Sequence, residues 1–412
     1  MLINRIGLLI AAGVVCAGAV VAELADTLAT PADHPAIGYY NYLQHPPRDV
    51  VSELSRKTQQ GSVQLRFDNG TGYLRSVLDA LHVPVESQVV VFSKTSLQTE
   101  RIEPHNPRTI FFNDSVAVAW VRGGFIEMAS QDPELGVIFH SLAQQPASHP
   151  DVQRRDDCLR CHISDISLGV PGMMIRSRYT APDGMPQLIL GGFSTDHRSP
   201  LKERWGGWYV TGKIDPGLHL GNMVFPREEG ARPAHLDFRG EGYLSPYSDV
   251  AALLVFNHQM HMMNLITRMG WDVRAGLHAK RRDLPVLLRQ SAKELVDYLL
   301  FIDEAPLPAP VESTSGFAAK FAARGPVDSH GRSLRQLDLR TRLLRYPCSY
   351  MIYSPAFDSL PAEARSAVYQ RMWQVLSGEE TGFRYVRLSA ADRTAIIGIL
   401  RETKPGLPAY FR

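Results

Sequence analysis

The sequence predicts an α+β protein, with a β-rich N-terminal part, a central loop-rich segment and a helical C-terminal part. Three observations predict this fold class. Residues 88–142 consist of short runs of valine, isoleucine and phenylalanine split by asparagine, aspartate and glycine, which is typical of strands. Residues 146–200 show little periodicity. From residue 248 onward, the spacing of apolar residues is typical of helices.

The N-terminal part is expected to contain two helices followed by strands. Apolar spacing predicts the helices at residues 50–57 and 72–81. The strand-like runs cover residues 88–92, 109–112, 115–121, 125–129 and 136–142. Two further strands are predicted in the middle of the chain, at residues 187–190 and 207–211.

A long helix is predicted over residues 249–269. Ser248 is expected to cap it, Asp249 favours its first turn, and Gly270 is expected to end it. A second helix is predicted over residues 286–303.

Two more helices are predicted near the C-terminus. One begins after Pro361 and ends at Gly378. The other begins at Ser389, is supported by Asp392 three residues later, and ends before Pro405.

A domain boundary is predicted at residues 305–310, where three of six residues are proline. The predicted division is a signal peptide or N-terminal anchor, a β-rich domain, a central region that contains a Cys-x-x-Cys-His motif and the helix 249–269, and a helical region, at residues 1–22, 23–145, 146–304 and 305–412.

Composition and net charge limit the classes of function that the chain can have. The chain has 412 residues, of which 44% are hydrophobic, enough for a large buried core. Its 44 lysines and arginines nearly balance its 42 aspartates and glutamates, leaving a net charge of +2. We therefore expect no binding to nucleic acid.

The N-terminus predicts export. Arg5 is followed by an almost wholly apolar run at residues 6–22, which ends in small residues before Glu23. We therefore expect a periplasmic or otherwise extracytoplasmic protein. An uncleaved anchor in the inner membrane is the alternative, because the run is about as long as the shorter membrane spans.

The motif that carries chemistry is Cys158-Leu159-Arg160-Cys161-His162. Two cysteines three residues apart lie on one face of a helical turn, from which both thiols can form thioethers with the vinyl groups of a haem. The adjoining histidine can bind the iron as its proximal ligand. The motif therefore predicts one covalently attached haem c.

Chance, a zinc site and a redox-active cysteine pair are the alternatives to haem attachment. With 4 cysteines and 14 histidines, chance would produce the spacing in roughly one chain in a thousand. A zinc site needs two further ligands nearby, and Cys348 is the only other cysteine after the export signal. A redox Cys-x-x-Cys motif should follow a strand, whereas this one follows a polar run at residues 151–157.

With Gly169-Val170-Pro171-Gly172 following it, the motif resembles that of the c-type cytochrome superfamily. The resemblance implies that the carbonyl of Pro171 holds the proximal His162, although an ordinary turn residue is an equal alternative. The length of the chain around the motif is similar to that of large exported single-haem bacterial proteins of unassigned function.

The second axial ligand of the iron decides the class of function. A methionine or histidine there suits electron transfer, whereas an open position suits chemistry. The first candidate is His258, on an apolar face of the helix predicted at residues 249–269, although a hydrogen-bonded core histidine is the plainer interpretation. The lesser candidates are His261, His219 and Met223.

The leading hypothesis is an exported single-haem cytochrome that transfers electrons to or from a partner protein. The alternative is a peroxidase- or oxygenase-like haem enzyme, or a haem-based sensor of small ligands. In these, His258 or His261 would act as a distal acid and base without binding the iron. The aromatic cluster around Trp205 and Trp208 either walls a haem edge or packs in the core.

Overall fold

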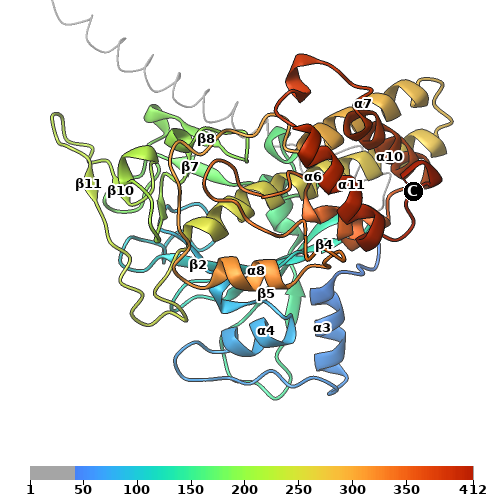
Figure 1. The fold of residues 1–412 in the computed structure, drawn as a ribbon. Helices are drawn as coiled ribbons and strands as arrows, with labels where there is room; N and C mark the ends of the chain where they lie inside the picture. Colours follow the sequence, from blue (N-terminus) through green and yellow to red (C-terminus); the bar gives the residue numbers. More distant parts are fainter. Residues whose placement is uncertain (1–41, 412) are drawn as a thin grey trace, which may run out of the picture.

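The computed structural model describes residues 42–411 and has an α+β fold, as predicted. Strands occupy mainly the N-terminal half and helices the C-terminal half (Figure 1). The predicted signal or anchor at residues 1–22 lies outside the described residues. No helix among residues 42–411 is both long enough and apolar enough to cross a membrane.

A seven-stranded antiparallel sheet forms the centre of the molecule. The five strands predicted between residues 88 and 142 are confirmed, and two short strands extend the sheet at its edges. In spatial order the strands are β6 (Val152–Arg154), β5 (Gly136–Leu142), β4 (Ile126–Asp132), β3 (Val116–Trp120), β2 (Arg108–Phe112), β1 (Val89–Val91) and β9 (Trp208–Tyr209).

Two small hairpins lie beside this sheet. Strand β7 (Arg176–Arg178) pairs with β8 (Gly192–Ser194), and β10 (Met223–Val224) pairs with β11 (Ala234–His235). The strand predicted at residues 187–190 is wrong, because Leu188–Leu190 form a single 3-10 turn. Ile189 in that turn is 97% exposed, so the apolar run that suggested a buried strand points into solvent.

Helices cover both faces of the central sheet (Figure 1). Helices α3 (Val50–Gln59) and α4 (Leu74–Ala80), both predicted, lie on one face. The long helix α6 (Val250–His278) crosses the other face. Alternate side chains of the strands therefore join two separate cores, one with α3 and α4 and one with α6.

Helix α6 differs from the prediction at both ends. Asp249 is the cap, since its Oδ1 accepts hydrogen bonds from the first backbone N–H groups, whereas Ser248 Oγ donates to the carbonyl of Tyr209 at 2.6 Å. Gly270 does not end the helix, which runs on to His278. Burial of Trp271 beyond it, at 2% exposure, outweighs the cost of about 1 kcal/mol for an interior glycine.

The other helices largely follow the sequence signals. Ser389 Oγ accepts from the N–H of Asp392 at 3.1 Å, and Gly378 ends its helix in a left-handed conformation with φ of 88°, both as predicted. Two short helices, α8 and α9, were not predicted. The helices of this part are α7 (Leu284–Leu299), α8 (Phe317–Ala323), α9 (Pro355–Asp358), α10 (Ala362–Ser377) and α11 (Ala390–Thr403).

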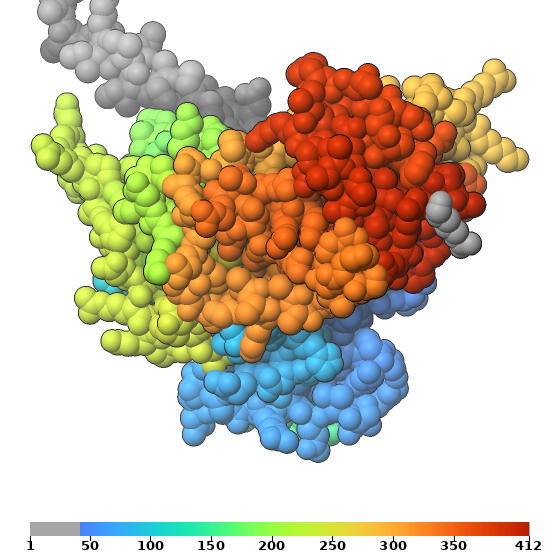
Figure 2. Space-filling model, viewed as in Figure 1, coloured from blue at the N-terminus to red at the C-terminus, as the bar shows by residue number. Residues whose placement is uncertain are grey.

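The segment at residues 305–310, predicted as a linker, is tied to the rest of the chain. The N–H of Ala305 donates to the carbonyl of His197, and the N–H of Leu307 to that of Thr341, both at 3.0 Å. The main core also draws side chains from the whole described chain, from Tyr42 to Phe411. The C-terminal part (orange to red) adjoins the N-terminal helices (blue) in Figure 2.

Candidate functional site

A cavity of about 370 Å³ lies between the central sheet and helix α6. Its floor is the α6-facing side of β2 to β5, where the side chains of Ala117, Ala119 and Ala129 are small. The opposite side of the same strands carries larger residues such as Val118 and Met128. The sheet is thus hollowed on one face only, because successive side chains alternate between faces.

All three motif residues line this cavity. Cys158 ends a 3-10 turn and Cys161 and His162 follow in the short helix α5 (Leu159–His162), so the motif forms the helical turn that its spacing predicts. Leu159, only 1% exposed, anchors this turn in the main core. The structure therefore brings together the three residues predicted to hold a haem.

His162 lines the cavity and has one unprotonated ring nitrogen. Its Nδ1 lies 2.8 Å from the carbonyl oxygen of Gly172, which can only accept a hydrogen bond. Burial lowers the pKa of His162 to about 4, so the ring is neutral at pH 7 and its one proton sits on Nδ1. Nε2 keeps its lone pair and has no hydrogen-bond partner within residues 42–411, the state required of a metal ligand.

The carbonyl that holds His162 belongs to Gly172, so the prediction for Pro171 is wrong by one residue. The Pro171 carbonyl instead accepts the N–H of Val137 at 2.9 Å. Gly136, with φ of 91°, brings the chain close enough for this bond, since a Cβ at that position would lie 2.7 Å from the Pro171 oxygen. The Pro171 carbonyl is thus hydrogen-bonded to strand β5, and the next carbonyl, that of Gly172, is free to accept from His162.

Helix α6 fixes the turn that carries this carbonyl. Asn264 Oδ1 accepts from the N–H of Met173 at 3.1 Å, and Asn264 Nδ2 donates to the carbonyl of Met173 at 2.7 Å. A Cβ on Gly172 would lie 2.2 Å from Asn264 Oδ1, so only glycine fits between the turn and the helix. Ser167 Oγ adds a bond of 3.2 Å to the carbonyl of His162.

Strand β6 precedes the motif, contrary to the expectation from the polar run at residues 151–157, but Cys158 lacks the property of a redox-active thiol. Both are free thiols, Cys158 partly buried and Cys161 exposed. Burial raises the pKa of Cys158 to about 12, whereas a thiol nucleophile needs a lowered pKa. The third cysteine, Cys348, is buried as predicted.

No zinc site forms at the motif. Among residues 42–411, the one set of three metal-ligating side chains close enough to share an ion is Asp328, His330 and Glu402. None of these three lines the cavity, so the motif lacks the partners that a zinc site would need.

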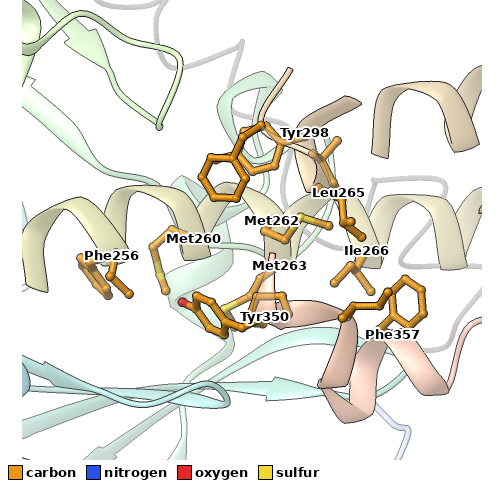
Figure 3. Close-up of a cluster of buried hydrophobic side chains, with 14 of the residues drawn as sticks. Phe256, Met260, Met262, Met263, Leu265, Ile266, Tyr298, Tyr350 and Phe357 are labelled. Atoms are coloured by element: carbon orange, nitrogen blue, oxygen red, sulfur yellow. The ribbon is translucent and has the colours of Figure 1, made fainter. Parts of the chain in front are cut away.

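The structure places His258 away from the cavity. It is completely buried, with Nδ1 2.7 Å from Nδ1 of His197 and Nε2 2.7 Å from Oγ of Ser349. Its ring stacks on Tyr298, whereas Figure 3 shows Phe256 and Met260 on the side of α6 that faces the sheet. His258 is therefore the hydrogen-bonded core histidine of the plainer interpretation.

The other predicted distal ligands do not line the cavity either. His261 Nε2 lies 3.1 Å from a guanidinium nitrogen of Arg198, on the Tyr298 side of α6. His219 Nδ1 accepts from the N–H of Gly221 at 2.9 Å. Met223 lies in the β10–β11 hairpin, opposite His235.

Cavity residues that sequence reasoning missed are of two kinds. Thioethers are provided by Met173, Met174 and Met260, and charges by Arg108, Glu127, Arg155, Asp157 and Arg176. Met260 lies on α6 four residues after Phe256, on a side of the helix that the predicted ligands do not share. Arg108 begins β2 and Glu127 is the second residue of β4, a strand with several other polar residues, so no local pattern marks either as a cavity residue.

Of the aromatic cluster, Trp208 lines the cavity and its Nε1 donates to the carbonyl of Arg176 at 2.8 Å. Trp205 is fully buried in the core and donates to Asn257 Oδ1. Both tryptophans belong to the main core, and Trp208 in addition borders the cavity.

Fold and site together define an α+β protein with a Cys-x-x-Cys-His motif at an amphipathic cavity between sheet and helix. Comparison with protein-family models, curated proteins and solved structures finds no match to this chain. The functional argument therefore rests on the residues of the site.

Proposed function

We propose that the protein is an exported c-type cytochrome that carries one haem c and transfers electrons to or from a partner protein outside the cytoplasm. The observation that supports this most is that a neutral His162, whose Nε2 has no hydrogen-bond partner within residues 42–411, lines one cavity together with Cys158 and Cys161. An occupant with a metal centre and two thiol-reactive substituents would use all three side chains.

The lining of the cavity fits a haem. Its alanine floor leaves room against the sheet for a flat apolar ring, and its volume lies within the roughly 300–1,000 Å³ of ordinary ligand pockets. Cys158 and Cys161 would form the thioethers and His162 would bind the iron. A haem so held supplies a centre that exchanges one electron.

The residues around the motif orient His162 and pack against it. The Gly172 carbonyl orients His162 and keeps its proton on Nδ1, which raises the basicity of Nε2. Phe139 packs against the imidazole with 4.6 Å between ring centroids. Cys161 is exposed, so the motif reaches the protein surface, where a redox partner would dock.

A second candidate function is a haem-dependent oxidoreductase or small-ligand sensor. It is favoured by the positions of the predicted distal ligands, none of which lines the cavity: His258, His261, His219 and Met223. Of the cavity-lining side chains, Met173, Met174 or Met260 would then be the candidate second ligand of the iron, and without such a bond the iron would keep an open coordination site. A ligated iron suits electron transfer and an open one suits chemistry.

Visible spectra of the purified, exported protein test the proposal. We expect one haem per chain that survives denaturation in pyridine, and its loss in Cys158→Ala and Cys161→Ala. Cys348→Ala is the matched control, because this thiol is buried away from the cavity and its loss should leave the haem count at one. Absence of covalent haem in the wild type would overturn the proposal.

The same spectra separate the two candidates. A low-spin, six-coordinate spectrum supports electron transfer, whereas a high-spin spectrum places the enzyme or sensor first. Sequencing the N-terminus of the purified protein shows whether residues 1–22 are removed.

A further inference from the structure

The charges that line the cavity do not cancel. Three arginines face two carboxylates, so the lining carries a net charge of +1: Arg108, Arg155 and Arg176 against Glu127 and Asp157. Two of the arginines have partners, with Arg108 Nε 2.7 Å from Glu127 Oε2 and Arg155 Nη2 2.7 Å from Asp157 Oδ2. The excess positive charge therefore belongs to Arg176.

Arg176 has no carboxylate partner within residues 42–411, and its Nε contacts the sulfur of Met174 at 3.3 Å. Arg178 follows two residues later on β7, likewise without an ion pair among the described residues. Burial and the charge of Arg176 both lower the pKa of Arg178, so the two guanidinium groups repel each other. An anion held at Arg176 would relieve this repulsion.

The Arg108–Glu127 ion pair is close in distance but lacks the geometry of a hydrogen bond. It joins β2 to β4 across Ala119 of β3, whose methyl group leaves room for the two long side chains. Both side chains are mostly buried, at 19% and 16% exposure. Arg108 Nε and Glu127 Oε2 nevertheless lack the alignment of a hydrogen bond, so the guanidinium keeps bonding capacity for a third group.

Arg108 and Arg176 line the same cavity as His162, the residue that would bind the iron. Their guanidinium groups therefore place positive charge beside the space that would hold the haem. A positive, largely apolar cavity attracts small anions more strongly than neutral molecules of the same size.

We propose that the cavity binds a small monovalent anion, of the size and charge of azide or nitrite, between Arg108 and Arg176, with Glu127 limiting its affinity. This inference rests on the proposed haem site, because the anion would lie beside the bound haem. Glu127 weakens binding in two ways, since it occupies Arg108 and repels the anion.

The anion bound at Arg176 could be a free anion or one of the two carboxylates of the haem itself. A carboxylate of the haem at Arg176 would change the reduction potential of the haem when the arginine is removed. A free anion at Arg176 would instead depend on the arginine for its affinity. The two sources are therefore distinguishable in one set of variants.

The experiment titrates the oxidised, haem-loaded protein with azide and follows the visible spectrum. We expect Arg176→Gln to weaken azide binding about tenfold, the effect of losing one charge-assisted hydrogen bond. Arg108→Gln should also weaken it, and Glu127→Gln should strengthen it. Arg227→Gln is the matched control, an exposed arginine that pairs with Asp183 and lies outside the cavity.

Carbon monoxide bound to the reduced protein is the uncharged control, and its affinity should not change in Arg176→Gln. Equal azide affinity in wild type, Arg176→Gln and Arg108→Gln overturns the inference. A changed reduction potential with unchanged azide affinity assigns Arg176 to the haem carboxylate and overturns it as well. If a haem-loaded protein binds neither azide nor carbon monoxide, the inference fails while the proposed cytochrome stands. Absence of covalent haem overturns both.

Discussion

At the scale of single residues, the backbone rather than a side chain orients His162. The Gly172 carbonyl holds the imidazole, and Asn264 of α6 holds the turn that carries this carbonyl through two hydrogen bonds to Met173. The turn is short and tightly packed, so a methyl group added there must displace Asn264. Orientation of the candidate iron ligand thus depends on an amide 102 positions away in the chain.

Gly172→Ala should therefore destabilise the protein and reduce its haem content. We expect the free energy of unfolding to fall by roughly 1–3 kcal/mol, as for overpacked cores. Urea denaturation measures the loss, and the pyridine spectrum measures the haem. In an Asn264→Ala background the same substitution should cost less, because the clash is removed. Equal costs in both backgrounds would contradict the role given to Asn264.

Glu304 is a buried carboxyl group. Burial raises its pKa from the usual 4.5 to about 7. Its Oε1 accepts a hydrogen bond from the N–H of Leu343 at 2.7 Å. The folded protein thus binds this proton more tightly than the unfolded chain. The group therefore destabilises the fold progressively as pH rises from about 4.5 to about 7.

Glu304→Gln, which keeps the accepting oxygen, should raise the free energy of unfolding by on the order of 3 kcal/mol at pH 8 and by little at pH 4.5. Urea denaturation at both pH values checks this. The exposed Glu312→Gln serves as control and should have little effect at either pH. A gain that does not depend on pH would disprove the role assigned to the carboxyl.

At the scale of elements, strand β3 forms the floor of the cavity. Its α6-facing residues Ala117 and Ala119 are the smallest that a strand can carry besides glycine, while Val116 and Val118 fill the other face. The hollow therefore arises from one strand face rather than from a gap between domains.

Ala119→Leu should fill the hollow and lower haem incorporation, measured by the pyridine spectrum, while the far-ultraviolet circular dichroism stays that of the wild type. Ala80→Leu on α4 adds the same volume on the other side of the sheet and should leave the haem content unchanged. Full haem content in Ala119→Leu would show that the floor does not border the haem.

Helix α6 has two functional faces of different kinds. The side toward the sheet lines the cavity with Phe256 and Met260 (Figure 3). The other side carries His258 in its hydrogen-bonded pair with His197, under Tyr298. His258→Leu should therefore leave the haem spectrum unchanged and lower the free energy of unfolding by roughly 2–4 kcal/mol, because Ser349 and His197 lose their partner.

Urea denaturation and the oxidised and reduced spectra of this variant test both expectations. His261→Leu, at a partly exposed position on the same side of α6, should cost less stability. A changed axial ligation in His258→Leu would return this residue to the role of distal ligand.

At the scale of the whole molecule, one core connects segments that the sequence assigns to different domains. Tyr42, Leu159, Leu254 and Phe411 all belong to it. The predicted boundary at residues 305–310 is bridged by backbone hydrogen bonds on both sides. How the chain divides into folding units stays a prediction that unfolding can test.

We expect a single cooperative transition in urea, with tryptophan fluorescence and far-ultraviolet circular dichroism changing together, because no predicted domain has a core of its own apart from the cluster under α3 and α4. Transitions that separate by probe would instead support independent domains.

The sequence by itself determined the features that depend on neighbouring residues. The five strands between residues 88 and 142, the caps at Ser389 and Gly378, and the helical turn of the motif are local patterns of spacing and hydrogen bonding, and the structure has them. The sequence also predicted that Cys158, Cys161 and His162 act together, since five consecutive residues lie close in any fold.

Only the tertiary structure decided what surrounds the motif. Periodicity shows that α6 has an apolar face but does not show which of its sides meets the sheet, so the sequence favours His258 although Met260 is the residue at the cavity. The choice of the Gly172 carbonyl over that of Pro171 likewise depends on Val137, which takes the other one. Both outcomes depend on packing between segments that are far apart in the chain, and a local pattern contains no information about such contacts.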